Sequence, residues 1–134
     1  AGVLILPAHE AILHGNTVRY EPAAHKNTLG YWTKEQDWVS WEFAVPRPGA
    51  YVVEVLQGCG KGSGGSEVEI EVGDQRVVFQ VVDTGHFQNF VARDIGTIDV
   101  REAGRQTLSV KPRSKPGAAA MDLREVRLKP VSRQ

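Results

Sequence analysis

The stretch Ser66-Glu67-Val68-Glu69-Ile70-Glu71-Val72-Gly73-Asp74-Gln75-Arg76-Val77-Val78-Phe79-Gln80-Val81 decides the fold class. Its first half alternates strictly between apolar residues and glutamates, so an extended strand would carry one apolar and one charged face. Gly73-Asp74 is a tight-turn pair, and Val77, Phe79 and Val81 repeat the alternation after it. The stretch therefore predicts a β-hairpin that buries one of its faces.

A second alternating stretch comes earlier in the chain. Residues 39–45 place Val39, Trp41 and Phe43 on one face, and the turn residues 46–49 lead into a further alternation over residues 51–55. We expect these two strands to form a second hairpin. The two hairpins together predict a core that contains Val39, Trp41, Phe43, Val53, Val55, Val68, Ile70, Phe79 and Val81. Trp38 has the opposite parity to Trp41, so it should lie on the other face, either covered by a loop or exposed.

The rest of the chain also favours strands. Short candidates occupy residues 3–6, 18–21, 97–100, 106–110 and 123–128, and residues 10–13 form a short turn or strand. Gly, Pro and Asn separate the candidates at intervals of about 8–12 residues, which is typical of sandwiches and barrels. No segment has a convincing helical pattern. The prediction is an all-β protein, a jelly-roll β-sandwich of two antiparallel sheets, with residues 1–134 as one domain.

Composition excludes several classes of function. The chain has 16 Lys and Arg against 16 Asp and Glu, so no net charge attracts nucleic acid or an acidic membrane surface. No apolar run approaches the roughly 20 residues that span a bilayer. The single cysteine, Cys59, excludes an internal disulfide and a cysteine-based zinc site. The chain does not begin with Met, and we expect it to be a segment of a longer precursor.

The sequence offers no pattern that predicts catalysis. It lacks a Gly-x-Ser-x-Gly elbow, and its four histidines show no spacing for a metal. Glu42, Glu54 and the glutamates of residues 67–71 could supply a glycosidase pair, but a regular row of Glu is typical of a solvated sheet face. The glycines of residues 58–65 lack the helix and the ending of a phosphate loop. We expect a protein that is not an enzyme.

Aromatic residues are concentrated in two short segments. Residues 30–43 and 83–90 hold all three tryptophans, one of the three tyrosines and three of the four phenylalanines. Half-buried rings give large contact area at low entropic cost and are suited to sugars and similar amphipathic ligands. The alternative is that most of these rings simply pack in the core.

Seven short motifs follow one another along nearly the whole chain: Leu6-Pro7-Ala8-His9-Glu10-Ala11, Gly30-Tyr31-Trp32, Asp37-Trp38-Val39, Pro46-Arg47-Pro48-Gly49-Ala50-Tyr51, Thr84-Gly85-His86-Phe87-Gln88, Ala103-Gly104-Arg105-Gln106-Thr107-Leu108 and Ala120-Met121-Asp122. In this order the chain resembles the galactose-binding-like superfold, especially carbohydrate-binding modules of families 6 and 35. It is still more similar to the related modules at the C-termini of bacterial sulfatases and α-L-fucosidases.

The resemblance implies a ligand site and a calcium site. The sugar clamp would be Tyr31 or Trp32 opposite Phe87, with His86 as a polar neighbour. Ala120 stands where sugar-binding relatives carry an Asn, so one hydrogen-bonding arm is missing. Glu10 and Asp122 would be the remaining ligands of a structural calcium, although calcium prefers six to eight oxygens.

The resemblance also implies the function. We expect a non-catalytic accessory module of an exported enzyme, secreted or periplasmic, that acts on carbohydrates or sulfate esters. Its partner would be a glycan, bound weakly through loop aromatics. The alternative is a structural module that packs against its parent catalytic domain and binds no free sugar. Neither interpretation includes a nucleic-acid or membrane partner, or a cofactor other than calcium.

Overall fold

The hairpin that the alternating stretch predicts is present in the computed structural model, which describes residues 2–131. Strands β7 (Glu67–Val72) and β8 (Gln75–Gln80) pair antiparallel around Gly73-Asp74. The three apolar residues of β7 are buried, and the Arg76 guanidinium lies within 4 Å of two carboxylates of the glutamate face. The alternation therefore separates core from solvent, because adjacent side chains of a strand point to opposite faces.

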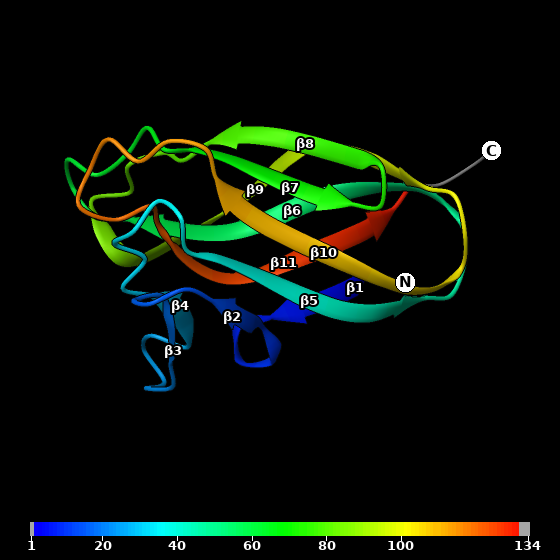
Figure 1. The fold of residues 1–134 in the computed structure, drawn as a ribbon, viewed down its shortest axis with the longest axis horizontal. Coiled ribbons are helices and arrows are strands. Elements are labelled where there is room, and N and C mark those ends of the chain that lie inside the picture. Colours follow the sequence, from blue (N-terminus) through cyan, green and yellow to red (C-terminus); the bar gives the residue numbers. More distant parts are fainter. Residues whose placement is uncertain (1, 132–134) are drawn as a thin grey trace.

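Eleven strands in the described residues form two antiparallel sheets that face each other, as Figure 1 shows. One sheet has the order β2-β5-β10-β7-β8, and the other has the order β3-β4-β11-β6-β9, with β1 also pairing with β11. The remaining bounds are β1 (Leu4–Pro7), β2 (Ile12–His14), β3 (Arg19–Glu21), β4 (Thr28–Gly30), β5 (Trp38–Val45), β6 (Gly49–Cys59), β9 (His86–Val100), β10 (Gly104–Pro112) and β11 (Asp122–Pro130). The predicted all-β sandwich is confirmed.

The expected second hairpin is wrong. Strands β5 and β6 do follow each other through the turn at residues 46–49, but they lie in different sheets and do not pair. The turn carries the chain across the core, so both strands point their apolar faces at each other through the interior. Alternation reveals which face is buried, but it does not distinguish a strand beside its neighbour from a strand across the core.

The core consists of the inner faces of the two sheets. Trp41 is 1% exposed, and its Nε1 donates to the Pro7 carbonyl at 2.8 Å. Every residue of the expected core is buried except Phe43, which is half-buried. Met121 is fully buried as well. The sandwich interior therefore follows from the period-two pattern of the individual strands.

Trp38 lies on the outer face of its sheet, as its parity predicts. It is half-buried between residues of the two strands that flank β5. The His14 ring stacks on it, with 3.7 Å between the ring centroids, and the Lys111 Nζ lies 4.3 Å from the Trp38 centroid. These neighbours cover the ring that the sequence left open as a binding residue.

The described residues contain no helix that is long and apolar enough to cross a membrane. The one helical element among them is a single 3-10 turn, Ala8–Glu10.

Two strand regions are longer than the sequence suggested: β9 begins at His86, and β6 runs to Cys59, into the expected glycine loop. These extensions bring β6 and β9 beside the loops that form the pocket described next.

Candidate functional site

A pocket of about 320 Å³ opens at one end of the sandwich, where the loop before β5 and the loop before β11 meet the start of β9. This is the left end of the molecule in Figure 1, where these connecting loops gather. The volume lies at the lower end of the range for small-ligand sites. The lining residues are Glu21, Lys26, Tyr31, Thr33, Phe87, Gln88, Ala118, Ala119 and Asp122.

Tyr31 stands at the mouth of the pocket. It is 50% exposed, and its backbone φ of 51° lies in the left-handed region that residues other than glycine and asparagine rarely adopt. The Arg19 guanidinium carbon lies 3.8 Å from the ring centroid and covers one face of the ring. Half of the residue surface of Tyr31 nevertheless remains exposed. A strained backbone that presents a large exposed ring is characteristic of a binding site.

Phe87 contributes a second ring to the same pocket. It is half-buried and packs against the core, near the start of β9. Gly60 makes room for it, because a Cβ at position 60 would lie 2.3 Å from the ring carbon Cε2. Tyr31 and Phe87 belong to segments that are 56 positions apart in sequence, and the fold brings both to one cavity.

The structure places the other two expected ligand-binding residues outside the pocket. Trp32 is fully buried, and its Nε1 donates to the Asp37 carbonyl at 2.8 Å, so the ring is a core residue that no sugar can reach. This part of the expected clamp is wrong: after Tyr31 the next side chain points inward. His86 is exposed, and its Nδ1 accepts a hydrogen bond from the Gln88 N–H at 3.1 Å.

Two carboxylates lie on the pocket wall. Asp122 is 4% exposed, and the Gln88 Nε2 donates to its Oδ2 at 3.0 Å. Burial raises the pKa of the Asp122 carboxyl to about 7, and the negative charge of Glu21 adds to the effect, while the Gln88 hydrogen bond opposes it. Glu21 is 8% exposed, and its Oε2 accepts from the Lys26 Nζ at 3.1 Å.

Gly30 brings the two carboxylates together. A Cβ at this position would lie 2.2 Å from the Glu21 Oε1 and 3.5 Å from the Asp122 Oδ1. Both oxygens therefore lie close to the Gly30 backbone, directly before Tyr31. A larger residue at position 30 would therefore displace the Glu21 carboxylate from this place.

Asp37 holds the neighbouring loop in place. Its carboxylate is fully buried and accepts hydrogen bonds from the backbone N–H groups of Asn16, Thr17 and Val18, at 2.8–3.1 Å. Burial alone would raise the pKa of Asp37, but these bonds outweigh it and hold the pKa below its usual value. The Thr17 hydroxyl also donates to Asp37 and accepts from Thr33, which lines the pocket. Asp37 is thus a positioning residue for one side of the pocket.

The expected calcium site does not fit the residues present. Glu10 lies in the 3-10 turn with a 64% exposed side chain, and its carboxylate lies 3.5 Å from the His9 Nε2. Asp122 faces the pocket beside Glu21 instead. No group of three or more His, Cys, Asp or Glu side chains in residues 2–131 is placed to hold a metal ion. Calcium prefers six to eight oxygens, so Glu10 and Asp122 form no such site.

Other chemically notable groups have structural explanations. Burial raises the pKa of the Cys59 thiol to about 11, and the Asp83 and Asp122 carboxylates contribute, so the thiol is protonated and unreactive at neutral pH. A larger cavity between the turn at residues 46–49 and Pro130 contains one aromatic residue, Tyr51. That ring is buried, and its hydroxyl donates to the Arg47 carbonyl.

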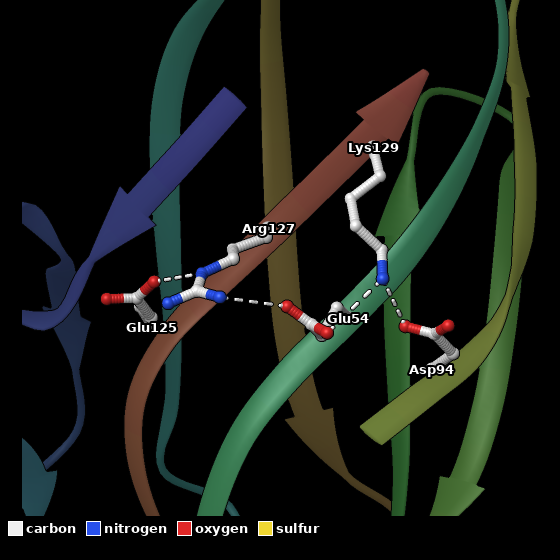
Figure 2. Close-up of polar contacts among 5 residues, drawn as sticks. All are labelled: Glu54, Asp94, Glu125, Arg127 and Lys129. Carbon is white, nitrogen blue, oxygen red and sulfur yellow. Dashed lines mark hydrogen bonds and ion pairs between the residues drawn. The ribbon is translucent and has the colours of Figure 1, made fainter. Parts of the chain in front are cut away.

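A row of charges crosses the outer face of the β6 sheet. Figure 2 shows Arg127 between Glu125 and Glu54, and Lys129 between Glu54 and Asp94. Each of the five side chains has an opposite charge as partner. The network is partly exposed, with side-chain exposures between 15% for Glu54 and 57% for Asp94, and every charge in it is paired, so it offers no free group for chemistry.

The sequence reasoning missed most of the polar pocket residues. Glu21 and Lys26 flank the short β3–β4 turn, and β4 itself had no recognised pattern. The sequence carried no signal for Glu21, because the alternation of residues 18–21 places it with Arg19 on the face opposite Val18 and Tyr20. Gln88 lies within the quoted Thr84–Gln88 motif, but the expected site included only its neighbours His86 and Phe87.

Solved structures with the same fold cover the whole sandwich. A family 35 carbohydrate-binding module from Clostridium thermocellum is 15% identical with a TM-score of 0.78, covering 98% of this chain and 100% of that chain. The carbohydrate-binding module CBM6cm-2 of Cellvibrio mixtus lichenase 5A, solved with cellotriose, is 18% identical with a TM-score of 0.73, covering 96% and 98%.

A third structure places the fold inside an enzyme. The β-(1,4)-mannanase GH26-CBM35 of Podospora anserina is 14% identical with a TM-score of 0.69, and the match covers 99% of this chain but 28% of that one. At these identities the likeness establishes the fold. The resemblance to modules of families 6 and 35 is thereby confirmed.

Comparison of the sequence with curated proteins and with protein families gives one match, to a family. No curated protein matches the sequence significantly. The sequence pattern of a family described as "Domain of unknown function (DUF5077)" matches residues 13–132. Because this match extends over most of the chain, the protein belongs to the DUF5077 family.

Proposed function

We propose that the protein is a non-catalytic module that binds a glycan weakly in the pocket between Tyr31 and Phe87. The observation that carries the proposal is that two aromatic rings from distant segments line one cavity of ligand size. Solved relatives of the same fold are carbohydrate-binding modules, one of them solved with cellotriose, which supports this class of ligand.

The geometry suggests how a sugar would bind. The apolar face of a pyranose ring stacks on the exposed surface of Tyr31, while the edge of Phe87 and the methyl groups of Ala118 and Ala119 exclude water. Hydroxyl groups of the sugar meet Gln88 and the acids of the pocket wall. Such stacking contributes about 1–3 kcal/mol per ring by analogy with bases on aromatics. We therefore expect dissociation constants on the order of millimolar to tens of micromolar.

We further propose that the module is an accessory part of a longer, exported enzyme of the carbohydrate-active or sulfatase type. The Podospora GH26-CBM35 mannanase supports this arrangement, because it combines an enzyme and a carbohydrate-binding module in one chain. The domain itself has no expected activity. Its two pocket carboxylates lie against Gly30, and Glu21 is paired with Lys26 rather than placed to activate water.

Paired variants test the binding proposal. Tyr31→Ala removes the stacking surface and should abolish binding, whereas Tyr31→Phe keeps the ring and should retain most of it. Phe87→Leu fills similar core space without a flat ring and should weaken binding. Titration calorimetry against neutral and charged oligosaccharides measures the affinities, and thermal unfolding checks that each variant is folded. The proposal fails if no glycan binds the wild type at millimolar concentration, or if Tyr31→Ala binds normally.

A second candidate is a module that packs against its parent catalytic domain without binding free sugar. It is favoured by four exposed apolar side chains in the first strands and their flanks: Val3, Ile5, Ile12 and Leu13. In this case Ile5→Lys should loosen the contact between domains in the full-length protein, measured by limited proteolysis of the connection. Tyr31→Ala should have no effect on it.

A further inference from the structure

The wall of the pocket contains carboxylate oxygens that accept no hydrogen bond. Among the described residues, the Asp122 Oδ2 accepts from Gln88 and the Glu21 Oε2 accepts from Lys26, whereas the Asp122 Oδ1 and the Glu21 Oε1 accept from no donor. In residues 2–131, the Ser66 Oγ is the one side-chain nitrogen or oxygen that is fully buried and has no hydrogen-bond partner. The Asp122 Oδ1 also has no partner, so it cannot be fully buried. The Asp122 Oδ1 therefore keeps contact with the pocket space, although the residue as a whole is 4% exposed.

The charge balance of the pocket is negative when Asp122 is ionised. Three lining residues carry charge: Glu21, Lys26 and Asp122. The Lys26 ammonium is bound to Glu21 at 3.1 Å, so its charge is already neutralised. Arg19 stacks on the ring of Tyr31 and approaches Glu21 at 3.9 Å, so its charge is shared with the same carboxylate. The partner that the pocket lacks is a positive or hydrogen-donating group beside the Asp122 Oδ1.

We propose that this pocket selects sugars that carry an amine over sugars that carry a carboxylate or sulfate, with the Asp122 Oδ1 as the acceptor for the amine. The inference rests on the proposed function and narrows its ligand class. An ammonium at this position makes a charge-assisted hydrogen bond in a partly desolvated pocket, which is about twice as strong as a neutral one. An anionic sugar meets the ionised Asp122 carboxylate, which has no cationic partner, and is repelled.

The titration of Asp122 agrees with this selection. Its pKa of about 7 arises from burial of the carboxylate among the pocket walls, with Glu21, Lys26, Gln88 and Cys59 as the polar and titratable groups near it. A cationic ligand stabilises the ionised carboxylate, and an anionic ligand stabilises the protonated one. Amine binding should therefore strengthen between pH 5 and 7, and binding of an acidic sugar should weaken over the same range.

Matched sugars that differ at one substituent provide the test. Methyl glycosides of glucose, glucosamine and glucuronic acid, and the corresponding galactose series, are titrated into the wild-type protein by calorimetry at pH 6.5 and low salt. We expect each amino sugar to bind about three- to tenfold more tightly than its neutral parent, and each acid to bind more weakly than the parent. Asp122→Asn should reduce the amine preference to less than twofold. Glu42→Gln changes an exposed carboxyl on the other sheet and should keep the full preference.

The outcomes separate the inference from the function on which it rests. If the acidic sugars bind as tightly as the amino sugars, the selectivity is wrong while glycan binding stands. If the amine preference survives in folded Asp122→Asn, another group is the acceptor and the assignment to Asp122 fails. Absence of binding by every sugar overturns both proposals. The wild-type series remains decisive even if Asp122→Asn fails to fold, because it needs no variant.

Discussion

Replacing Asp122 with asparagine should change how the stability of the protein depends on pH. The folded-state pKa of this carboxyl is about 7, above the 3.8 expected for the unfolded chain. Between these two values the folded state holds a proton that the unfolded state has lost. The contribution of this carboxyl to the free energy of unfolding is therefore largest below about pH 4 and falls as the pH rises to 7, where the folded state must also ionise the buried group.

The magnitude follows from the size of the shift. About three pKa units at 1.36 kcal/mol per unit give on the order of 4 kcal/mol. Water entering the open pocket reduces this upper value, so we expect about 2–4 kcal/mol. Asparagine is nearly isosteric and does not ionise, and its amide oxygen can still accept from Gln88. Asp122→Asn should thus match the wild type near pH 4.5 and exceed it by about 2–4 kcal/mol at pH 8.

Urea unfolding of both proteins at half-unit intervals from pH 4.5 to 8 measures the difference. Subtracting one curve from the other removes the titration of every other group. Glu42→Gln is the matched control, because it removes a carboxyl from an exposed position on the other sheet. A flat difference curve for Asp122→Asn would show that the buried carboxyl is not destabilised at neutral pH, which would refute the reasoning.

Four further changes test other parts of the structure. Trp41→Ala should cost about 3–5 kcal/mol in urea unfolding, because it empties a fully buried site; a loss under 1 kcal/mol would contradict the core assignment. Asp37→Ala leaves three backbone donors without an acceptor and should cost about 3 kcal/mol or more above pH 4, with the loss shrinking in acid, where the wild-type carboxylate is itself protonated. Gly60→Ala should displace the Phe87 ring and weaken glycan binding in calorimetry, even though no ring is removed. Glu54→Ala should cost only about 0.5–1 kcal/mol, and a loss of several kcal/mol would show that the charge network stabilises more than a surface network does.

The sequence was sufficient for the fold because alternation reports burial directly. Val68, Ile70 and Val72 are buried and the glutamates between them face solvent, as the period of two requires. The pairing of strands could not be predicted in the same way. The turn at residues 46–49 has proline and glycine like a hairpin turn, yet it crosses between sheets, since the local sequence does not encode which distant strand lies beside β5.

The site was predictable only where the signal was a large ring. Tyr31 and Phe87 line the same pocket, but the direction of Trp32 depends on the left-handed backbone of Tyr31, which no pattern in the sequence indicates. Glu21 and Asp122 meet because β3 and β11 both border β4, which is three residues long and has no alternation to detect. Polar pocket residues of this kind are defined by tertiary neighbours.

The arrangement of the pocket itself favours ligand binding over a purely structural role. A surface that only packs against another domain gains most from apolar side chains and loses free energy for every buried charge without a partner. Here the fold keeps the Asp122 carboxylate in a cavity, without a partner for its Oδ1, and holds Tyr31 exposed on a strained backbone. Both features reduce stability when the pocket is empty, and a ligand that stacks on the ring and donates to the acid would offset this cost. A domain-packing surface would gain little from either feature, which supports the proposal that the pocket binds a ligand.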